Sequence, residues 1–219
     1  MTDAPLGGPH RDALVHTAGA GMEAAACAVI LIHGRGASAE SILELKPLLD
    51  FPDVIYLAPQ ASGYTWYPYS FLAPLDRNEP DLSSGLQVIT DTVVRLDDAG
   101  IPAERVVIGG FSQGACLASE FVARNARRFG GLIVLSGGLI GPLGMNRSYT
   151  GSLDGTPVFL GCSDRDPHIP LERVDETAVV LTSMGASVVK QIYPDLGHTI
   201  IGDEIDHARR IIASAAGVA

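Results

Sequence analysis

A serine inside a glycine-rich pentapeptide is the first residue of this sequence with a clear chemical use. Residues 110–114 read Gly-Phe-Ser-Gln-Gly, the G-x-S-x-G pattern, and they end an apolar run that predicts a strand. A helical pattern begins at Gln113, so Ser112 is expected on a sharp strand-to-helix turn, beside the positive end of the helix dipole. Such a turn presents a nucleophilic hydroxyl. The alternative is a helix N-cap serine in a glycine-rich turn.

A serine nucleophile needs a base, and His198 is the histidine best placed to act as one. It lies between the last predicted strand and the last predicted helix, which puts it at the carboxyl edge of a parallel sheet. Four other histidines fit less well, because they lie inside the last helix, on the acid-bearing loop or before the core: His207, His168, His10 and His16. The alternative for His198 is a surface histidine with no role.

An orienting carboxylate is expected between the serine and the histidine, on the loop that follows a strand predicted at 158–161. That loop carries two acids, Asp164 and Asp166. Asp166 is preferred because Pro167 restricts its backbone to extended conformations and so fixes the direction of its carboxylate. Asp164 is the second choice. The alternative is an Asx turn, in which the side chain only caps local backbone amides.

An oxyanion hole needs two backbone amides aimed at the tetrahedral oxygen. Gln113, directly after the serine, is expected to supply one amide, and Arg35 the other. Arg35 lies in His-Gly-Arg-Gly at 33–36, where the glycines allow close backbone approach. A glycine-rich turn before a helix is the alternative, and the Arg35 side chain is expected in solvent rather than on an anionic substrate.

Strand and helix patterns alternate along the chain and predict the elements that must position these residues. The apolar strand-like runs are 28–32, 54–58, 106–111, 132–136, 158–161 and 188–193, and the helical patterns are 39–49, 84–98, 113–125, 171–184 and 204–215. Pro47 should end or kink the first helix. The order predicts a single α/β domain over residues 1–219, with a mostly parallel sheet, helices on both faces and a loosely ordered extension at 1–14.

A long irregular stretch at 60–82 is predicted to be a lid or binding loop. Five of the 13 aromatic residues fall between Tyr64 and Phe71. This aromatic segment, with Trp66, Tyr67 and Phe71 as its candidate binding residues, is expected to wall the substrate site and to favour aryl or short-to-medium acyl groups over charged ones. The alternative is that these rings pack under their own loop.

Composition excludes several classes of function. The net charge of −10 opposes a nucleic-acid or anionic membrane partner, and no apolar stretch approaches the 20 or so residues of a membrane span, so no integral membrane association is expected. Three cysteines without a C-x-x-C pair favour a reducing, cytoplasmic setting over disulfides or zinc. No cofactor and no metal site is expected. A G-x-G-x-x-A match at 34–39 would suit a dinucleotide, but the next strand ends in Pro59-Gln60 without the required acid.

Taken together, these motifs resemble the phospholipase/carboxylesterase family of α/β-hydrolases, which includes the acyl-protein thioesterases. The likeness covers residues 28–213 and rests on 33–36, 110–114, Asp166-Pro167 with Ile169-Pro170, and Gly197-His198, in family order. The resemblance implies an α/β-hydrolase fold without a large cap domain. It also implies an acyl-serine mechanism on small-molecule carboxylic esters, with thioesters and lysophospholipids as further candidates.

The roles that the resemblance implies coincide with those argued from the residues. Ser112, Asp166 and His198 would be the triad, and the amides of Arg35 and Gln113 the oxyanion hole. The chain departs from the protein-depalmitoylating members, which show Gly-Leu-Gly and Trp-aromatic-Asp where it has 34–36 Gly-Arg-Gly and 66–68 Trp-Tyr-Pro. It therefore looks more like the bacterial carboxylesterase branch. A hydrolase-like binding protein without activity is the alternative, and the oligomeric state stays open, a homodimer included.

Overall fold

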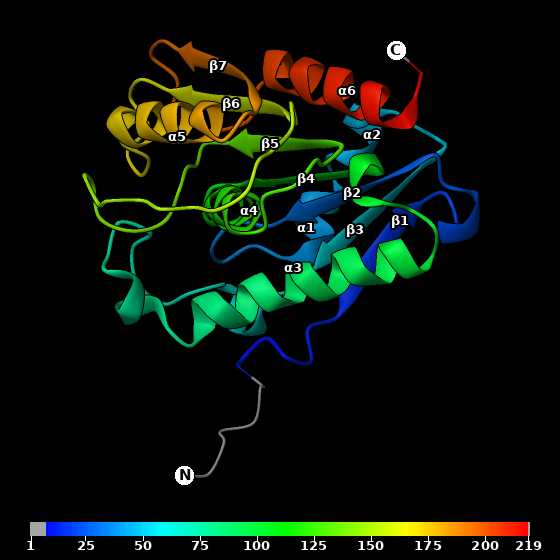
Figure 1. Ribbon diagram of the computed structural model, residues 1–219, viewed down its shortest axis with the longest axis horizontal. Helices are drawn as coiled ribbons and strands as arrows, with labels where there is room; N and C mark the ends of the chain where they lie inside the picture. Colours follow the sequence, from blue (N-terminus) through cyan, green and yellow to red (C-terminus); the bar gives the residue numbers. More distant parts are fainter. Residues whose placement is uncertain (1–7, 219) are drawn as a thin grey trace.

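Figure 1 shows the computed structural model, which describes residues 8–218. A seven-stranded sheet crosses its centre in the order β1-β3-β2-β4-β5-β6-β7. The strands are β1 (Val15–Gly19), β2 (Cys27–Ile32), β3 (Val54–Pro59), β4 (Val106–Phe111), β5 (Gly131–Leu135), β6 (Pro157–Ser163) and β7 (Ser187–Tyr193). Strand β1 runs antiparallel to β3, and all other neighbouring strands are parallel. The carboxyl ends of six strands therefore meet at one edge, where the loops can assemble a site.

In the described part of the chain, six α-helices cover the two faces of this sheet (Figure 1). They are α1 (Ala39–Leu43), α2 (Lys46–Leu49), α3 (Asp81–Asp98), α4 (Gln113–Arg124), α5 (Leu171–Ser183) and α6 (Gly202–Ala216). Single 3₁₀ turns lie at η1 (Met22–Ala24), η2 (Ser62–Tyr64), η3 (Leu75–Asn78) and η4 (Ala103–Arg105). The predicted α/β architecture with a mostly parallel sheet and helices on both faces is confirmed. Within residues 8–218 no large cap domain covers the sheet.

The core consists of two apolar layers, one on each face of the sheet. In the central strand β2, Ile30 and Ile32 pack into the layer under α3, α4 and α5, whereas Val29 and Leu31 pack into the layer under α1, α2 and α6. Because successive side chains of a strand point to opposite faces, a strand covered on both sides must be apolar throughout. This explains why β2 and β3 are buried at every position.

Most boundaries agree with the sequence, and the exceptions have local causes. The break expected at Pro47 is confirmed, since α1 ends at Leu43 and α2 begins at Lys46 with the proline in its first turn. Strand β1 was not expected, because it is a half-exposed edge strand that carries no continuous apolar run. Helix α3 begins at Asp81, three residues before the predicted start, so the irregular segment is slightly shorter than expected.

The amino-terminal extension is partly fixed to the core. Residues 1–7 of the expected loose segment lie outside the described part of the chain. His10 is only 1% exposed, and its two ring nitrogens contact Trp66 O at 3.0 Å and the Ser62 amide at 3.0 Å. The amide of Ser62 can only donate to Nδ1, so Nε2 carries the proton and donates to Trp66 O. His10 thereby holds the aromatic segment from the side of α3.

Candidate active site

Ser112 occupies the strained turn that joins β4 to α4. Its backbone has φ 56° and ψ −119°, a left-handed region that side chains rarely adopt and that here is held by its neighbours. The Ser112 amide donates to Leu135 O of β5 at 3.0 Å. A Cβ atom at Gly114 would lie 2.1 Å from Ile32 O, and one at Gly110 would lie 2.6 Å from Gly114 C. Only glycine fits at both places, which explains the motif around the serine.

His198 and Asp166 come from different loops and meet at the carboxyl edge of the sheet. His198 Nδ1 lies 2.6 Å from Asp166 Oδ2, and the Asp166 carboxylate is fully buried. The other carboxylate oxygen, Oδ1, accepts the amides of His168 at 2.8 Å and Ile169 at 3.0 Å. Asp166 thus makes the Asx-type turn and the contact with histidine at once, so the two interpretations of this residue are not exclusive.

Burial and hydrogen bonding act in opposite directions on Asp166. Burial by itself would raise the pKa of the carboxyl, but the hydrogen bond to His198 and the two backbone amides hold the pKa below its ordinary value. The carboxyl group is therefore ionised at neutral pH and accepts a hydrogen bond from the protonated Nδ1 of His198. With the hydrogen on Nδ1, the Nε2 atom of the imidazole is free to accept a proton.

Asp164, the second choice as acid, has a different partner. Its Oδ1 accepts the amide of Asp195 at 2.9 Å, and Arg165 pairs with Asp195 at 2.9 Å. Ser163 Oγ also donates to Leu196 O. These contacts join the loop after β6 to the loop after β7, so Asp164 contributes to the placement of the histidine loop without contacting the ring.

The glycine-rich turn at 33–36 lies directly against the nucleophile turn. A Cβ atom added to Gly34 would already touch Phe111 O and Ser112 Cβ, each 3.4 Å away, so the two turns pack closely with little room between them. His33 is buried, which lowers its pKa, and it accepts the amide of Ala61 at Nε2 (3.1 Å) while Nδ1 lies 2.8 Å from Gly34 O. A neutral imidazole that donates from Nδ1 satisfies both contacts and fixes this turn.

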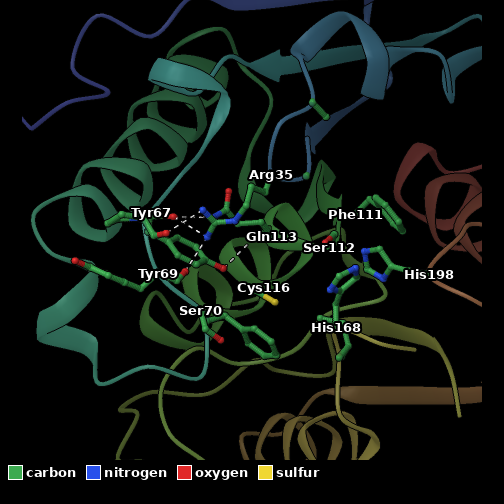
Figure 2. Close-up of a pocket in the computed structure, with 15 residues that line it drawn as sticks. Arg35, Tyr67, Tyr69, Ser70, Phe111, Ser112, Gln113, Cys116, His168 and His198 are labelled. Atoms are coloured by element: carbon green, nitrogen blue, oxygen red, sulfur yellow. Dashed lines mark hydrogen bonds between the residues drawn. The ribbon is translucent and has the colours of Figure 1, made fainter. Parts of the chain in front are cut away.

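A cavity of about 540 Å³ opens beside Ser112 and His198 (Figure 2). Its aromatic and aliphatic lining side chains are Tyr67, Tyr69, Phe71, Phe111 and Ile169, and Arg35 from the turn at 33–36 also lines it. Among the described residues, neither an acid nor a lysine lines it. Burial raises the pKa of the Cys116 thiol to about 12 and that of the Tyr67 phenol well above its usual value, so both wall groups are uncharged. The cavity suits a neutral, largely apolar ligand.

The structure separates the three aromatic residues that were expected to bind substrate. Tyr67 and Phe71 line the cavity, but Trp66 does not, so that part of the expectation is wrong. Trp66 is completely buried, and its indole Nε1 donates to His33 O at 3.0 Å. The alternative of packing under the loop holds for this ring because the indole finds its polar partner in the core rather than at the surface.

Several lining residues were not expected from the sequence. Phe111 stands immediately before the serine, and its ring centroid lies 4.7 Å from that of His198. His168 stands at the exposed rim, with its ring edge toward His198 at 4.9 Å between centroids (Figure 2). Ile169 is the third of these residues, whereas Tyr69 belongs to the aromatic segment 64–71 that was expected to wall the site. Their closeness in the chain to predicted site residues was the only available signal, because side-chain direction depends on the folded loops.

The Arg35 side chain is also not where it was expected. Although exposed, it is hydrogen-bonded to oxygen atoms of residues 65–69 rather than simply solvated (Figure 2).

The position at which a dinucleotide site needs an acid holds Gln60, whose Oε1 accepts a hydrogen bond from the Ala39 amide at 2.8 Å. Within residues 8–218 no group of three His, Cys, Asp or Glu residues could hold a metal ion, and no helix there could cross a membrane.

Comparisons with known proteins show the family to which the chain is related. The sequence profile of the family described as Phospholipase/Carboxylesterase matches residues 19–215. The crystal structure of a phospholipase/carboxylesterase from Dyadobacter fermentans is 41% identical, with a TM-score of 0.87, over 91% of this chain and 96% of that one. An acyl-protein thioesterase 1 of Cryptococcus neoformans is 25% identical over 88% of this chain and 94% of its own.

A further relative matches only part of the chain. The acyl-protein thioesterase 1 of Gibberella zeae is 31% identical over 52% of this chain and 50% of its own length. The profile match, in contrast, covers most of the chain and includes the serine, aspartate and histidine described above. The chain therefore belongs to the phospholipase/carboxylesterase family, has the α/β-hydrolase fold, and is an ester or thioester hydrolase.

Proposed function

We propose that the protein is a serine carboxylesterase that works through an acyl-Ser112 intermediate. The observation that carries the proposal is the buried Asp166 carboxylate, 2.6 Å from His198 Nδ1, beside the cavity that Ser112 also lines. A serine hydroxyl is a weak nucleophile by itself, and an oriented imidazole is the usual way to activate it.

In the proposed reaction His198 Nε2 takes the proton from Ser112 Oγ as that oxygen attacks the acyl carbon. Asp166 keeps the hydrogen on Nδ1 and stabilises the imidazolium that forms. The negatively charged oxygen of the tetrahedral intermediate accepts hydrogen bonds from the backbone amides of Arg35 and Gln113. His198 then returns the proton to the leaving alcohol or thiol. Water repeats the sequence on the acyl enzyme, releases the acid and restores Ser112.

The proposed substrates are esters whose acyl groups are uncharged and of short to medium length. Tyr67 and Phe71 offer apolar wall area, and a cavity of about 540 Å³ has room for such a group and part of its leaving group. Relatives named acyl-protein thioesterase make thioesters candidates beside oxygen esters, and lysophospholipids share the acyl ester. A reducing, cytoplasmic setting is supported by three free, buried cysteines, Cys27, Cys116 and Cys162. The net charge of −10 argues against a nucleic-acid partner.

The test is a panel of nitrophenyl esters and matching thioesters of graded acyl length, followed by Ser112→Ala. The variant should lose about 10⁴ to 10⁶ in kcat, whereas Ser183→Ala, an exposed serine at the end of α5, should keep full activity. A fluorophosphonate should label Ser112 alone. A Ser112→Ala enzyme with normal turnover would refute the mechanism, and a chain that binds esters without hydrolysing them would be the inactive binding protein.

A further inference from the structure

The Arg35 guanidinium holds one face of the cavity in place. Its two terminal nitrogens make four hydrogen bonds to a single segment, residues 65–69. Nη1 donates to Thr65 Oγ1 at 3.0 Å and Pro68 O at 3.0 Å, and Nη2 donates to Tyr67 O at 2.9 Å and Tyr69 O at 2.7 Å. All four terminal hydrogens are used, since each nitrogen carries two. Tyr67 and Tyr69 are themselves part of the cavity wall.

The Gln113 side chain also forms hydrogen bonds to this segment. Its Oε1 accepts the Trp66 amide at 2.9 Å and lies 3.2 Å from Thr65 Oγ1, and its Nε2 donates to Tyr67 O at 2.9 Å. Gln113 is buried. Figure 2 shows the side chains of Arg35 and Gln113 near one another, both directed toward Tyr67, whose carbonyl oxygen accepts a hydrogen bond from each.

Two residues thus have two parts with different partners. Their backbones belong to the turns beside Ser112, where their amides are the proposed hydrogen-bond donors to the oxyanion. Their side chains form hydrogen bonds to residues 65–69. We propose that Arg35 is a positioning residue that couples the cavity wall to the oxyanion hole. The inference rests on the proposed function. A displacement of the wall is transmitted through the guanidinium to the turn at 33–36, which packs closely against the turn that carries Ser112.

The guanidinium is suited to this task in a way that other side chains are not. Four acceptors around a planar fork need donors in fixed directions, which an ammonium on a flexible stem cannot supply. The use of the terminal hydrogens also leaves Arg35 little capacity to bind an anionic acyl group. The residue is therefore proposed to act on the substrate site by ordering its wall.

The experiment compares Arg35→Met and Arg35→Lys with Arg105→Met. Arg105 is the matched control, because its guanidinium also bonds two carbonyls, Ala26 O and Gly100 O, at the opposite end of the strands. Steady-state kinetics on acetyl and octanoyl nitrophenyl esters give kcat and KM. Acrylamide quenching of Trp66, the single tryptophan, reports the order of the segment without any dependence on activity.

We expect Arg35→Met to lower kcat/KM about 10- to 100-fold, mainly through kcat, as for a misplacement of about 1 Å at a reacting centre. The preference between acetyl and octanoyl esters should shrink, and quenching of Trp66 should increase. Arg35→Lys should recover less than about a tenth of the lost activity, because charge alone does not restore the fork. Arg105→Met should leave all three quantities unchanged while lowering the melting temperature.

Three results would overturn the inference. One is an Arg35→Met enzyme with a lower melting temperature but wild-type kcat, KM and acyl preference, which would make Arg35 a purely structural residue. Another is full recovery in Arg35→Lys, and the third is unchanged quenching of Trp66. If Arg35→Met does not fold, Thr65→Val removes one of the four acceptors and should shift the same quantities less. Absence of esterase activity in the wild type would instead refute the proposed function.

Discussion

Replacement of Asp166 by Asn tests the role of the carboxylate with little change in shape. The amide oxygen of the new side chain can still accept the amides of His168 and Ile169, now at 2.8 and 3.0 Å from Asp166 Oδ1. The atom that replaces Oδ2, 2.6 Å from His198 Nδ1, becomes an NH₂ donor. Two donors cannot share that contact, so the ring must present an unprotonated Nδ1 and carry its hydrogen on Nε2.

The altered ring can no longer accept the serine proton at Nε2. Loss of the correct tautomer and of the charge that stabilises the imidazolium should lower kcat about 10⁴-fold near neutral pH, with a much smaller change in KM. Asp164→Asn is the matched control on the same loop. Its amide oxygen retains the acceptor for the Asp195 amide, which lies 2.9 Å from Asp164 Oδ1, so this variant should lose less than about tenfold.

The assay is steady-state hydrolysis of a neutral nitrophenyl ester by both variants, with circular dichroism and melting temperature as controls of folding. The role of Asp166 is refuted if Asp164→Asn loses more activity than Asp166→Asn, or if folded Asp166→Asn stays within about tenfold of the wild type. Either result would remove Asp166 as the orienting acid and leave the assignments of Ser112 and His198 to their own tests.

Four further outcomes are expected. Burial raises the pKa of Glu204 from 4.5 to about 7, so the folded state binds this proton more tightly than the unfolded state and the free energy of unfolding falls as pH rises between those values. Glu204→Gln should remove this loss and raise the free energy of unfolding above pH 7, measured by urea denaturation, by at most about 3 kcal/mol. Parallel pH profiles of stability for the variant and the wild type would contradict this expectation. Trp66→Ala should cost about 3 to 5 kcal/mol with unchanged acyl preference, and a changed preference with unchanged stability would return the ring to the cavity wall. Phe71→Ala should change the ratio of kcat/KM between short and longer acyl esters, and an unchanged ratio would exclude Phe71 from the acyl site. Activity should survive EDTA, whereas loss with EDTA and recovery with zinc would contradict the mechanism.

The amino-acid sequence by itself determined the features that depend on neighbouring residues. The glycines around Ser112 and the proline after Asp166 constrain the backbone within a few residues, so their meaning can be deduced locally. The continuous apolar runs predicted the strands covered on both faces. Strand β1 lacks such a run, because an edge strand with few buried positions owes its conformation to pairing with β3.

Only the tertiary structure decided which distant groups meet. Asp164 and Asp166 are nearly equivalent in the sequence, but the folded loops bring Asp166 to His198 and Asp164 to the Asp195 amide. Arg35 was expected in solvent, yet its hydrogen-bond acceptors lie 30 to 34 residues along the chain. Hydrogen bonds between segments so far apart require a specific relative placement of loops, which local pattern does not encode. The cavity beside Ser112, and the choice between Tyr67 on its wall and Trp66 in the core, arise at that level.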